Sequence, residues 1–156
     1  MLINFICVGT KMPAWVNQGY EEYAKRLNKD VKIKLIEVAA SKRGKTTSVE
    51  KLKSEEAVRI QKILPKGAHI VVLDVKGKQW STENLSLQLE RWLHLGQDVN
   101  LIVGGPDGLD NNILKLADES WSLSSLTFPH PVVRVVVGEQ IYRAWSLLNN
   151  HPYHRA

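Results

Sequence analysis

Cysteine is almost absent from this sequence of 156 residues, in which Cys7 is the only one. A single thiol forms neither an intramolecular disulfide nor a cysteine metal cluster, so both are excluded within one chain. Cys7 lies inside an apolar run near the amino terminus, where a small buried thiol is far commoner than a nucleophile. We therefore expect Cys7 to be a core residue.

Long hydrophobic runs are missing as well. No segment approaches the ~20 apolar residues that span a bilayer. The apolar start from Met1 to Val8 has no basic stretch before it and no small-residue cleavage site after it, which argues against a signal peptide. We expect a cytoplasmic protein with no membrane partner. No repeat and no linker rich in glycine or proline divides the chain, so we expect residues 1–156 to form a single domain.

Positive charge, in contrast, is plentiful in one part of the chain. The net charge is +5, and residues 25–66 hold 13 basic and 5 acidic residues, while the remainder holds 8 basic and 11 acidic ones. Lysine and arginine gain free energy by displacing counterions from phosphates, so this distribution favours a polyanionic partner. A solvated, lysine-rich surface explains the same composition equally well.

Apolar runs bounded by turn residues alternate with stretches of helical period, which is typical of an α/β domain with a largely parallel sheet. The sequence predicts five strands, at residues 2–8, 31–38, 69–74, 99–103 and 120–123. It predicts helices that begin at Pro13, after Ser48, after Ser81 or Thr82, after Asp110 and at about Pro131. The last helix, which reaches Leu148, has such a wide apolar face that we expect a second copy of the chain to cover part of it.

Two loops resemble phosphate-binding motifs without matching them. The segment from Ala39 to Thr46 lies between a predicted strand and a predicted helix, as the GxxxxGK[ST] loop of nucleotide triphosphatases does, but Ala39 replaces the first glycine. Its basic side chains, Lys42, Arg43 and Lys45, suit RNA phosphates at least as well as ATP. We therefore expect an RNA-binding loop, with a P-loop-like ATPase as the alternative.

The second loop, Gly104-Gly105-Pro106-Asp107-Gly108, lacks the spacing of the dinucleotide fingerprint and follows a late strand. Three glycines at the end of a strand allow the backbone to approach a ligand at the carboxyl edge of the sheet. A tight turn between strand and helix is the alternative interpretation.

Short motifs along the whole chain are more specific than either loop alone. They are Val8-Gly9-Thr10-Lys11-Met12-Pro13, Lys42-Arg43-Gly44-Lys45, Leu73-Asp74, Gly104-Gly105-Pro106-Asp107-Gly108, Trp121-Ser122-Leu123-Ser124 and Asn150-His151-Pro152-Tyr153-His154-Arg155. Together they resemble the bacterial ribosomal RNA large-subunit methyltransferase H family, from end to end. One soft departure is Asp107, where glutamate is common in the family.

The resemblance implies a SPOUT fold, in which a parallel sheet has helices on both faces and the C-terminal part forms a trefoil knot. It implies a homodimer that uses S-adenosylmethionine, without a metal, to methylate N3 of a pseudouridine in 23S ribosomal RNA. The assembled large subunit or ribosome is the expected substrate. Carried over by position, the cofactor contacts would be Leu73, Gly104, Gly105, Leu123, Ser124, Ser125, Leu126, Thr127 and Phe128.

Methylation of an imide nitrogen requires that its proton leaves before or during attack. His130 and Glu139 are candidate bases, and Arg143 or Arg155 are candidates to stabilise the anionic oxygen. An ordinary turn residue is the alternative for His130, since it lies between two prolines. For Glu139 the alternative is an ion pair with Arg143 one helical turn away.

The tail offers further recognition groups, because Tyr153 can stack on an unpaired base while His154 and Arg155 hold its edge or a phosphate. We expect the tail to act across the subunit interface. A metal site at His151 and His154 is disfavoured, since only two ligands are offered. A non-catalytic ribosome-binding module is the remaining alternative for the whole protein.

Overall fold

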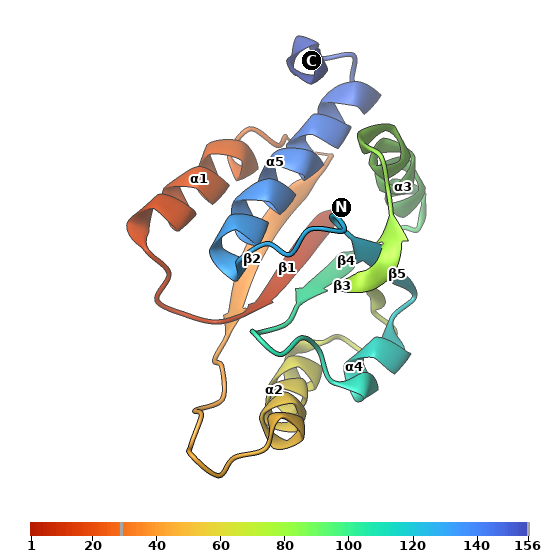
Figure 1. The fold of residues 1–156 in the computed structure, drawn as a ribbon. Coiled ribbons are helices and arrows are strands. Elements are labelled where there is room, and N and C mark those ends of the chain that lie inside the picture. The colour runs from red at the N-terminus through yellow and green to blue at the C-terminus, as the bar shows by residue number, and fades with distance from the viewer. Residues whose placement is uncertain (29, 156) are drawn as a thin grey trace.

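A computed structural model describes residues 1–28 and 30–155, which build a five-stranded sheet with helices on both faces (Figure 1). The strands are β1 (Leu2–Val8), β2 (Lys32–Val38), β3 (His69–Gln79), β4 (Val99–Val103) and β5 (Glu119–Ser122). Their order is β2-β1-β4-β3-β5, and every neighbouring pair is parallel. The predicted parallel sheet is thus confirmed, although β3 ends at Gln79 rather than at Asp74.

The helices begin where short polar side chains can cap them. They are α1 (Ala14–Ala24), α2 (Val49–Ile63), α3 (Thr82–His94), α4 (Asn111–Leu116) and α5 (His130–Leu148), followed by the 3-10 turn η1 (Pro152–His154). Ser48, Ser81 and Asp110 each accept a hydrogen bond from a backbone N–H in the first turn of α2, α3 and α4. These contacts satisfy donors that would otherwise lack a partner.

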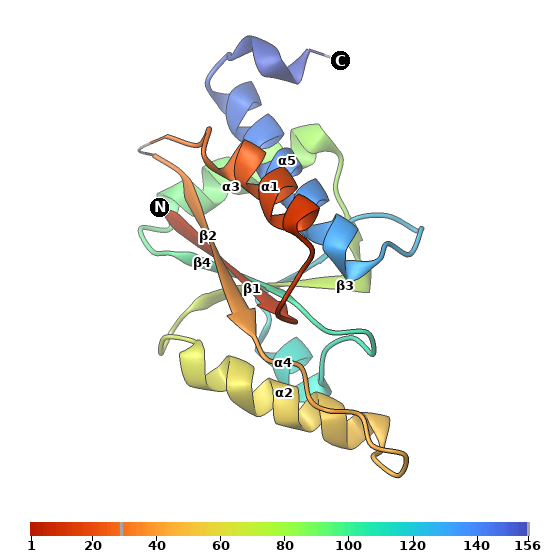
Figure 2. The ribbon, with the colours of Figure 1, turned by 90° about the vertical axis from the view of Figure 1, so that its left-hand side faces the viewer.

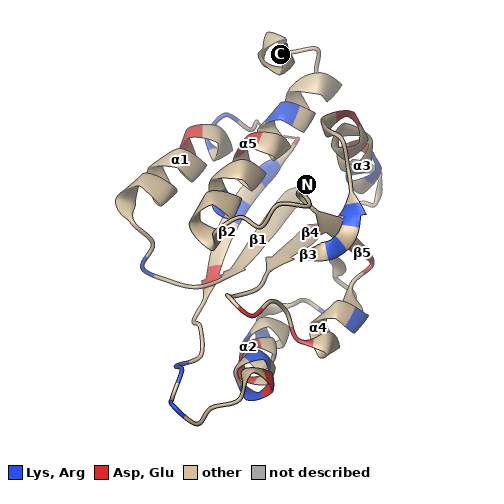
Figure 3. Ribbon diagram, viewed as in Figure 1, with Lys and Arg blue, Asp and Glu red and all other residues tan. Residues whose placement is uncertain are grey.

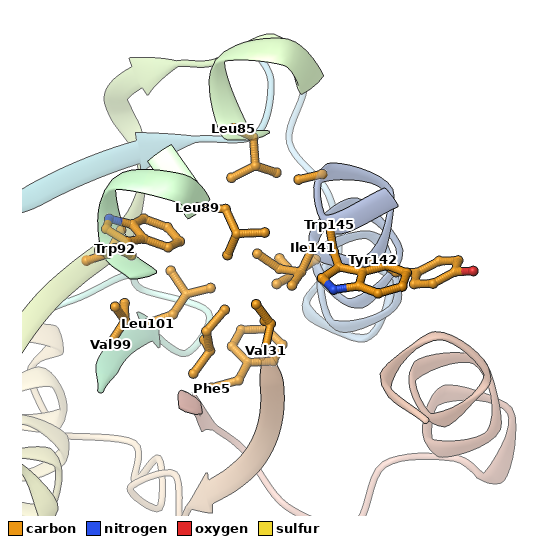
Figure 4. Packing of buried hydrophobic residues seen from close by; sticks show 14 of the residues in the cluster. Phe5, Val31, Leu85, Leu89, Trp92, Val99, Leu101, Ile141, Tyr142 and Trp145 are labelled. Carbon is orange, nitrogen blue, oxygen red and sulfur yellow. The ribbon is translucent and has the colours of Figure 1, made fainter. Parts of the chain in front are cut away.

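The sheet separates two hydrophobic layers, because successive side chains of a strand point to opposite faces. Phe5 and Cys7 of β1 face the layer of α1, α3 and α5, while Ile6 and Val8 face α2 and α4 (Figure 2). In the first layer, side chains of α3 and α5 meet those of β4 (Figure 4). Burial raises the pKa of the Cys7 thiol to about 12, which agrees with a core residue.

Helix α5 lies between α1 and α3, against the sheet (Figure 1). Its fully buried residues include Val137, Ile141 and Ala144, and none of its apolar side chains, all of which the structure describes, is among the exposed large hydrophobic ones. Val132, Val133, Val135 and Val136 are only partly buried, so part of the apolar face stays open in the single chain. The expectation that a second copy covers it stays a prediction. Within the described residues, no helix has the length and hydrophobicity to cross a membrane.

The extra length of β3 depends on its pairing with β5. The register shifts between Leu73 and Lys78, so the segment from Asp74 to Gly77 bulges out of the ladder. A Cβ atom on Gly77 would lie 2.8 Å from backbone atoms of β5, which only glycine avoids. The trefoil knot that the resemblance implies stays a prediction, because strand order and pairing do not by themselves define a threading.

Candidate functional site

A pocket of about 870 Å³ lies at the carboxyl ends of β4 and β5, beside the bulge within β3. Three segments form most of its wall: the β3 bulge from Leu73 to Lys76, the loop from Gly104 to Gly108, and residues 121–131 leading into α5. Open α/β sheets bind their ligands at this edge, since the strand ends leave room there for irregular backbone. The position and size of the pocket are suited to a small organic ligand.

The residues expected to contact a cofactor meet at this pocket, although they are far apart in the sequence. The pocket is lined by Leu73, Gly104, Gly105, Leu123, Ser124, Leu126, Thr127 and Phe128. Ser125 does not line it, and its hydroxyl accepts a hydrogen bond from the side-chain amide of Gln79 at 2.8 Å. Leu126 is 69% exposed, which leaves an apolar surface for a flat ring to cover.

The glycine loop is a tight turn and a pocket wall at once. Gly108 has a φ of +82° and donates its N–H to the carbonyl oxygen of Gly105 at 3.0 Å. A Cβ atom on Gly104 would lie 2.7 Å from the backbone of Gly108, whereas one on Gly105 would make an ordinary contact of 3.4 Å with the carboxylate of Glu56. Gly104 is therefore the position where the absence of a side chain matters most.

His130 lies in the pocket wall, but both of its ring nitrogens are engaged. Nδ1 is 3.3 Å from the carbonyl oxygen of Gly104, and Nε2 is 2.9 Å from Nε of Arg134. Because a guanidinium only donates, Nε2 accepts and the proton is on Nδ1. Burial, together with the nearby charge of Arg134, lowers the pKa of His130. This geometry argues against the general-base role suggested for His130, and it is also more than an ordinary turn residue.

Glu139 and Arg143 form a second cluster towards the other end of α5. The Glu139 carboxylate accepts hydrogen bonds from Arg143 Nε at 2.8 Å, Tyr153 Oη at 2.9 Å and Gln140 Nε2 at 2.8 Å. The Arg143 guanidinium also lies over the Tyr153 ring, 5.1 Å from its centroid. The ion pair weighed as an alternative is thus present, and both carboxylate oxygens of Glu139 already accept hydrogen bonds within the chain.

The tail is anchored to the body of the protein rather than frayed. The Tyr153 ring packs against Tyr142 with centroids 4.6 Å apart, and burial with the Glu139 hydrogen bond raises the pKa of Tyr153 to about 12. His151 accepts a hydrogen bond from the Tyr153 N–H. His154 is half-buried and Arg155 is exposed. In the described part of the chain, no three His, Cys, Asp or Glu side chains gather into a possible metal site.

The pocket and the tail lie at opposite ends of α5. His130 lines the pocket, whereas Glu139 is nine residues further along the helix, which corresponds to ~14 Å. The turn η1, which ends at His154, lies beyond the far end of α5 (Figure 1). Within one chain the structure therefore does not bring Tyr153, His154 and Arg155 to the pocket that contains His130.

The basic side chains Lys42, Arg43 and Lys45 are exposed on the loop between β2 and α2 (Figure 3). The loop departs from a P-loop in two respects. The backbone N–H of Ser41 donates to the buried carboxylate of Glu56 at 3.0 Å, so a negative charge already occupies a place where a phosphate loop needs open donors. The following helix begins only at Val49. Both features speak against the ATPase alternative.

Sequence reasoning missed Arg134, which is completely buried. Its guanidinium forms an ion pair with Glu37 of β2, with 2.8 Å between Nη1 and Oε2. The available signal was its position inside the run Val132-Val133-Arg134-Val135-Val136-Val137. An arginine on the apolar face of a helix requires buried partners, and the sequence alone does not identify them.

Comparisons with known proteins agree along the whole chain. The profile of the family described as "Predicted SPOUT methyltransferase" matches residues 1–154. A protein of Hydrogenovibrio crunogenus is 58% identical over 155 residues, covering 99% of both chains. A protein of Methylococcus capsulatus is 54% identical over 155 residues, covering 99% of this chain and 100% of its own. Both are named "Ribosomal RNA large subunit methyltransferase H".

Two solved structures resemble this one at low sequence identity. A methylase family protein from Haemophilus influenzae Rd KW20 has a TM-score of 0.56 at 9% identity and covers 95% of this chain and 68% of its own. One from Neisseria gonorrhoeae has a TM-score of 0.52 at 14% identity, covering 90% of this chain and 81% of its own. At these identities the likeness concerns the fold alone.

Proposed function

Because this chain belongs to the SPOUT methyltransferase family and is a ribosomal RNA methyltransferase, we propose that its methyl donor is S-adenosylmethionine and its target N3 of a pseudouridine in 23S ribosomal RNA. The observation that carries the proposal is the pocket at the carboxyl ends of β4 and β5, beside the bulge within β3. The family assignment disfavours both the ATPase and the non-catalytic binding module. A ribosomal substrate also makes the cytoplasm the expected compartment.

The pocket suits this cofactor in shape and chemistry. Leu123, Leu126 and Phe128 offer apolar surface for an adenine ring, while the backbone groups of the two loops can recognise its edge. The absence of a side chain at Gly104 allows the tight turn against Gly108 that shapes this wall of the pocket. When bound, the cofactor supplies a methyl group on a sulfonium that loses its charge on transfer. The protein contributes chiefly alignment, and this step requires no metal.

Removal of the N3 proton needs a group outside the pocket of the same chain. His130 and Glu139 have their acceptor atoms engaged by Arg134 and by Arg143 with Tyr153. We assign Arg155 to stabilise the negative charge on the carbonyl oxygens beside N3 while the proton passes to solvent. Tyr153 and His154 hold the base beside it, and Arg143 holds Tyr153 in place.

A homodimer explains how tail and pocket meet. Two copies of α5 packed antiparallel about a two-fold axis would bring the tail of one chain to the pocket of the other, since the two features lie at opposite ends of that helix. The loops with Lys42, Arg43 and Lys45 would then hold the RNA backbone around the site. Because parts of both chains would contact the RNA, the target should be RNA held in a fixed fold. We therefore expect the substrate to be the assembled large subunit or ribosome rather than naked RNA.

Calorimetry tests the cofactor assignment. S-adenosylmethionine and S-adenosylhomocysteine are expected to bind the intact protein saturably, with one site per chain, and ATP is expected not to bind. Purified protein with S-adenosylmethionine is also expected to methylate ribosomes that lack the modification. Saturable ATP binding without cofactor binding would overturn the proposal, and cofactor binding with no transfer to ribosomes would remove the substrate assignment.

A further inference from the structure

The buried guanidinium of Arg134 connects three segments that are remote in sequence. Its Nε donates to His130 at 2.9 Å, Nη1 to the Glu37 carboxylate at 2.8 Å and Nη2 to the carbonyl oxygen of Gly9 at 2.9 Å. The Arg134 side chain is 0% exposed. A buried charge is costly unless it is paired and its donors are satisfied, so this arrangement is built around the planar fork that only arginine offers.

The partner at Gly9 belongs to the turn between β1 and α1, which the proposed chemistry does not use. Gly9 has a φ of +132°, and a Cβ atom there would lie 3.1 Å from Met12 and 3.6 Å from Arg134 Nη2. Its N–H donates to the carbonyl oxygen of Val38 at 2.7 Å. The turn therefore presents its carbonyl oxygen to Arg134 in a backbone conformation that favours glycine.

The chain of contacts ends at the pocket. Arg134 Nε donates to Nε2 of His130, so the ring proton is on Nδ1. This Nδ1–H donates to the carbonyl oxygen of Gly104 at 3.3 Å. Gly104 is the residue at which the strand β4 turns into the glycine loop, and both Gly104 and His130 line the pocket. A change in the ring orientation of His130 would thus break its hydrogen bond to Gly104 and alter the pocket wall.

We propose that Arg134 is a positioning residue that holds His130 with its proton on Nδ1 and, through that proton, fixes the carbonyl group of Gly104 in the cofactor pocket. The inference rests on the proposed function, because it treats this pocket as the cofactor site. It assigns His130 to cofactor binding rather than to proton abstraction. Changes in this network therefore act on the affinity for S-adenosylmethionine more than on the rate of transfer.

Two substitutions at His130 separate positioning from base catalysis. In His130→Asn the amide nitrogen stands near the place of Nδ1 and keeps the donor to Gly104, whereas His130→Ala removes it. We expect His130→Ala to raise the Kd for S-adenosylmethionine about tenfold, and His130→Asn to restore most of that loss. At saturating cofactor, kcat is expected to fall less than the affinity in both variants. A ~100-fold loss of kcat in both, with unchanged Kd, would identify His130 as a base and overturn the inference.

Substitutions at Arg134 test the origin of the tautomer. Nitrogen NMR of the histidine rings is expected to show the Nδ1–H form for His130 in the wild-type protein and a mixed or charged form in Arg134→Lys. The matched control is Arg91→Lys, on the exposed part of α3, which leaves the signal and the cofactor affinity as in wild type. If Arg134→Lys does not fold, Glu37→Gln keeps an acceptor for Nη1 and is expected to give a smaller change of the same kind.

The outcomes distinguish this inference from the proposed function. If the wild-type protein fails to bind S-adenosylmethionine, the proposed function fails, and the NMR signal still decides whether Arg134 fixes the tautomer. If the wild-type protein binds the cofactor and His130→Ala binds it equally well, only the inference is overturned. An Nε2–H tautomer in the wild-type protein would overturn it in either case.

Discussion

Arg43 of the basic loop forms an ion pair with Asp107 of the glycine loop. The two residues are remote in sequence, and the pair joins the segment proposed to hold RNA to the segment that lines the cofactor pocket. Arg43 is 55% exposed, so solvent screens the pair and an RNA phosphate can compete for the guanidinium. Contact of Arg43 with RNA would therefore release Asp107, which lines the pocket.

Substitution of Arg43 tests the role of the basic loop. Arg43→Ala is expected to weaken ribosome binding and to lower the slope of log Kd against log salt by about one, because one phosphate contact is lost. The control is Lys25→Ala, which removes an exposed charge at the end of α1. The measurement is the Kd for ribosomes at several salt concentrations. Equal slopes for both variants and the wild-type protein would exclude the loop from the RNA interface.

The two glycines at the start of the loop are expected to differ. Gly104→Ala places a methyl group 2.7 Å from the Gly108 backbone, which costs ~1–3 kcal/mol of strain or moves the loop, while the methyl group of Gly105→Ala fits. Calorimetry is expected to show a large loss of S-adenosylmethionine affinity for the first variant and a small one for the second. The reverse order would show that the pocket wall is described wrongly.

The tail is expected to act in transfer and not in cofactor binding. Arg155→Ala is predicted to reduce methyl transfer at least ~100-fold, because the anion beside N3 loses its stabilising charge, with little change in cofactor affinity. Lys115→Ala, an exposed charge on α4, is the control for net charge. Measurement of both quantities on one preparation checks this. Loss of cofactor binding in Arg155→Ala would contradict the assignment.

Mixed dimers test whether tail and pocket come from different chains. The Gly104→Ala chain has an intact tail and a defective pocket. The Arg155→Ala chain has an intact pocket and a defective tail. After unfolding and refolding in equal amounts, about half of the dimers contain both chains and each of these has one intact site, so activity should recover to about a quarter of the wild-type level. No recovery, with mixed dimers demonstrably present, would mean that each tail serves its own chain.

Stability is expected to depend on pH through His130. Burial lowers the pKa of His130 below its ordinary value of 6.5, so the unfolded chain binds a proton more readily than the folded one. The contribution of the neutral ring is fully present above pH 6.5 and is lost as the pH falls towards the folded-state pKa. Thermal unfolding from pH 8 to pH 5 is expected to show a steeper decline for the wild-type protein than for His130→Asn. Identical slopes would contradict this assignment.

Much of the fold follows from local signals. The strands were predictable because apolar runs between turn residues suffice to identify a buried parallel strand, and the caps at Ser48, Ser81 and Asp110 use chemistry within a few residues. The extension of β3 to Gln79 was not predictable, since Asp74 to Gly77 carry no strand pattern and are held by β5. That pairing is a tertiary effect.

The site was accessible to sequence reasoning only in part. The glycine loop has a physical signature, but the pairing of Gly104 with the segment around Leu126 came from the family resemblance alone. The Arg134 network could not be predicted, because Gly9, Glu37 and His130 come together only in the folded chain. The distance between Tyr153 and the pocket likewise depends on how α5 is placed.

The most direct test of the account is mass spectrometry of 23S ribosomal RNA from ribosomes that lack the modification, before and after incubation with this protein and methyl-labelled S-adenosylmethionine. The account predicts one labelled methyl group per large subunit, on N3 of a pseudouridine, and none with heat-inactivated protein. A label on another base, on the ribose or on no RNA at all would contradict it.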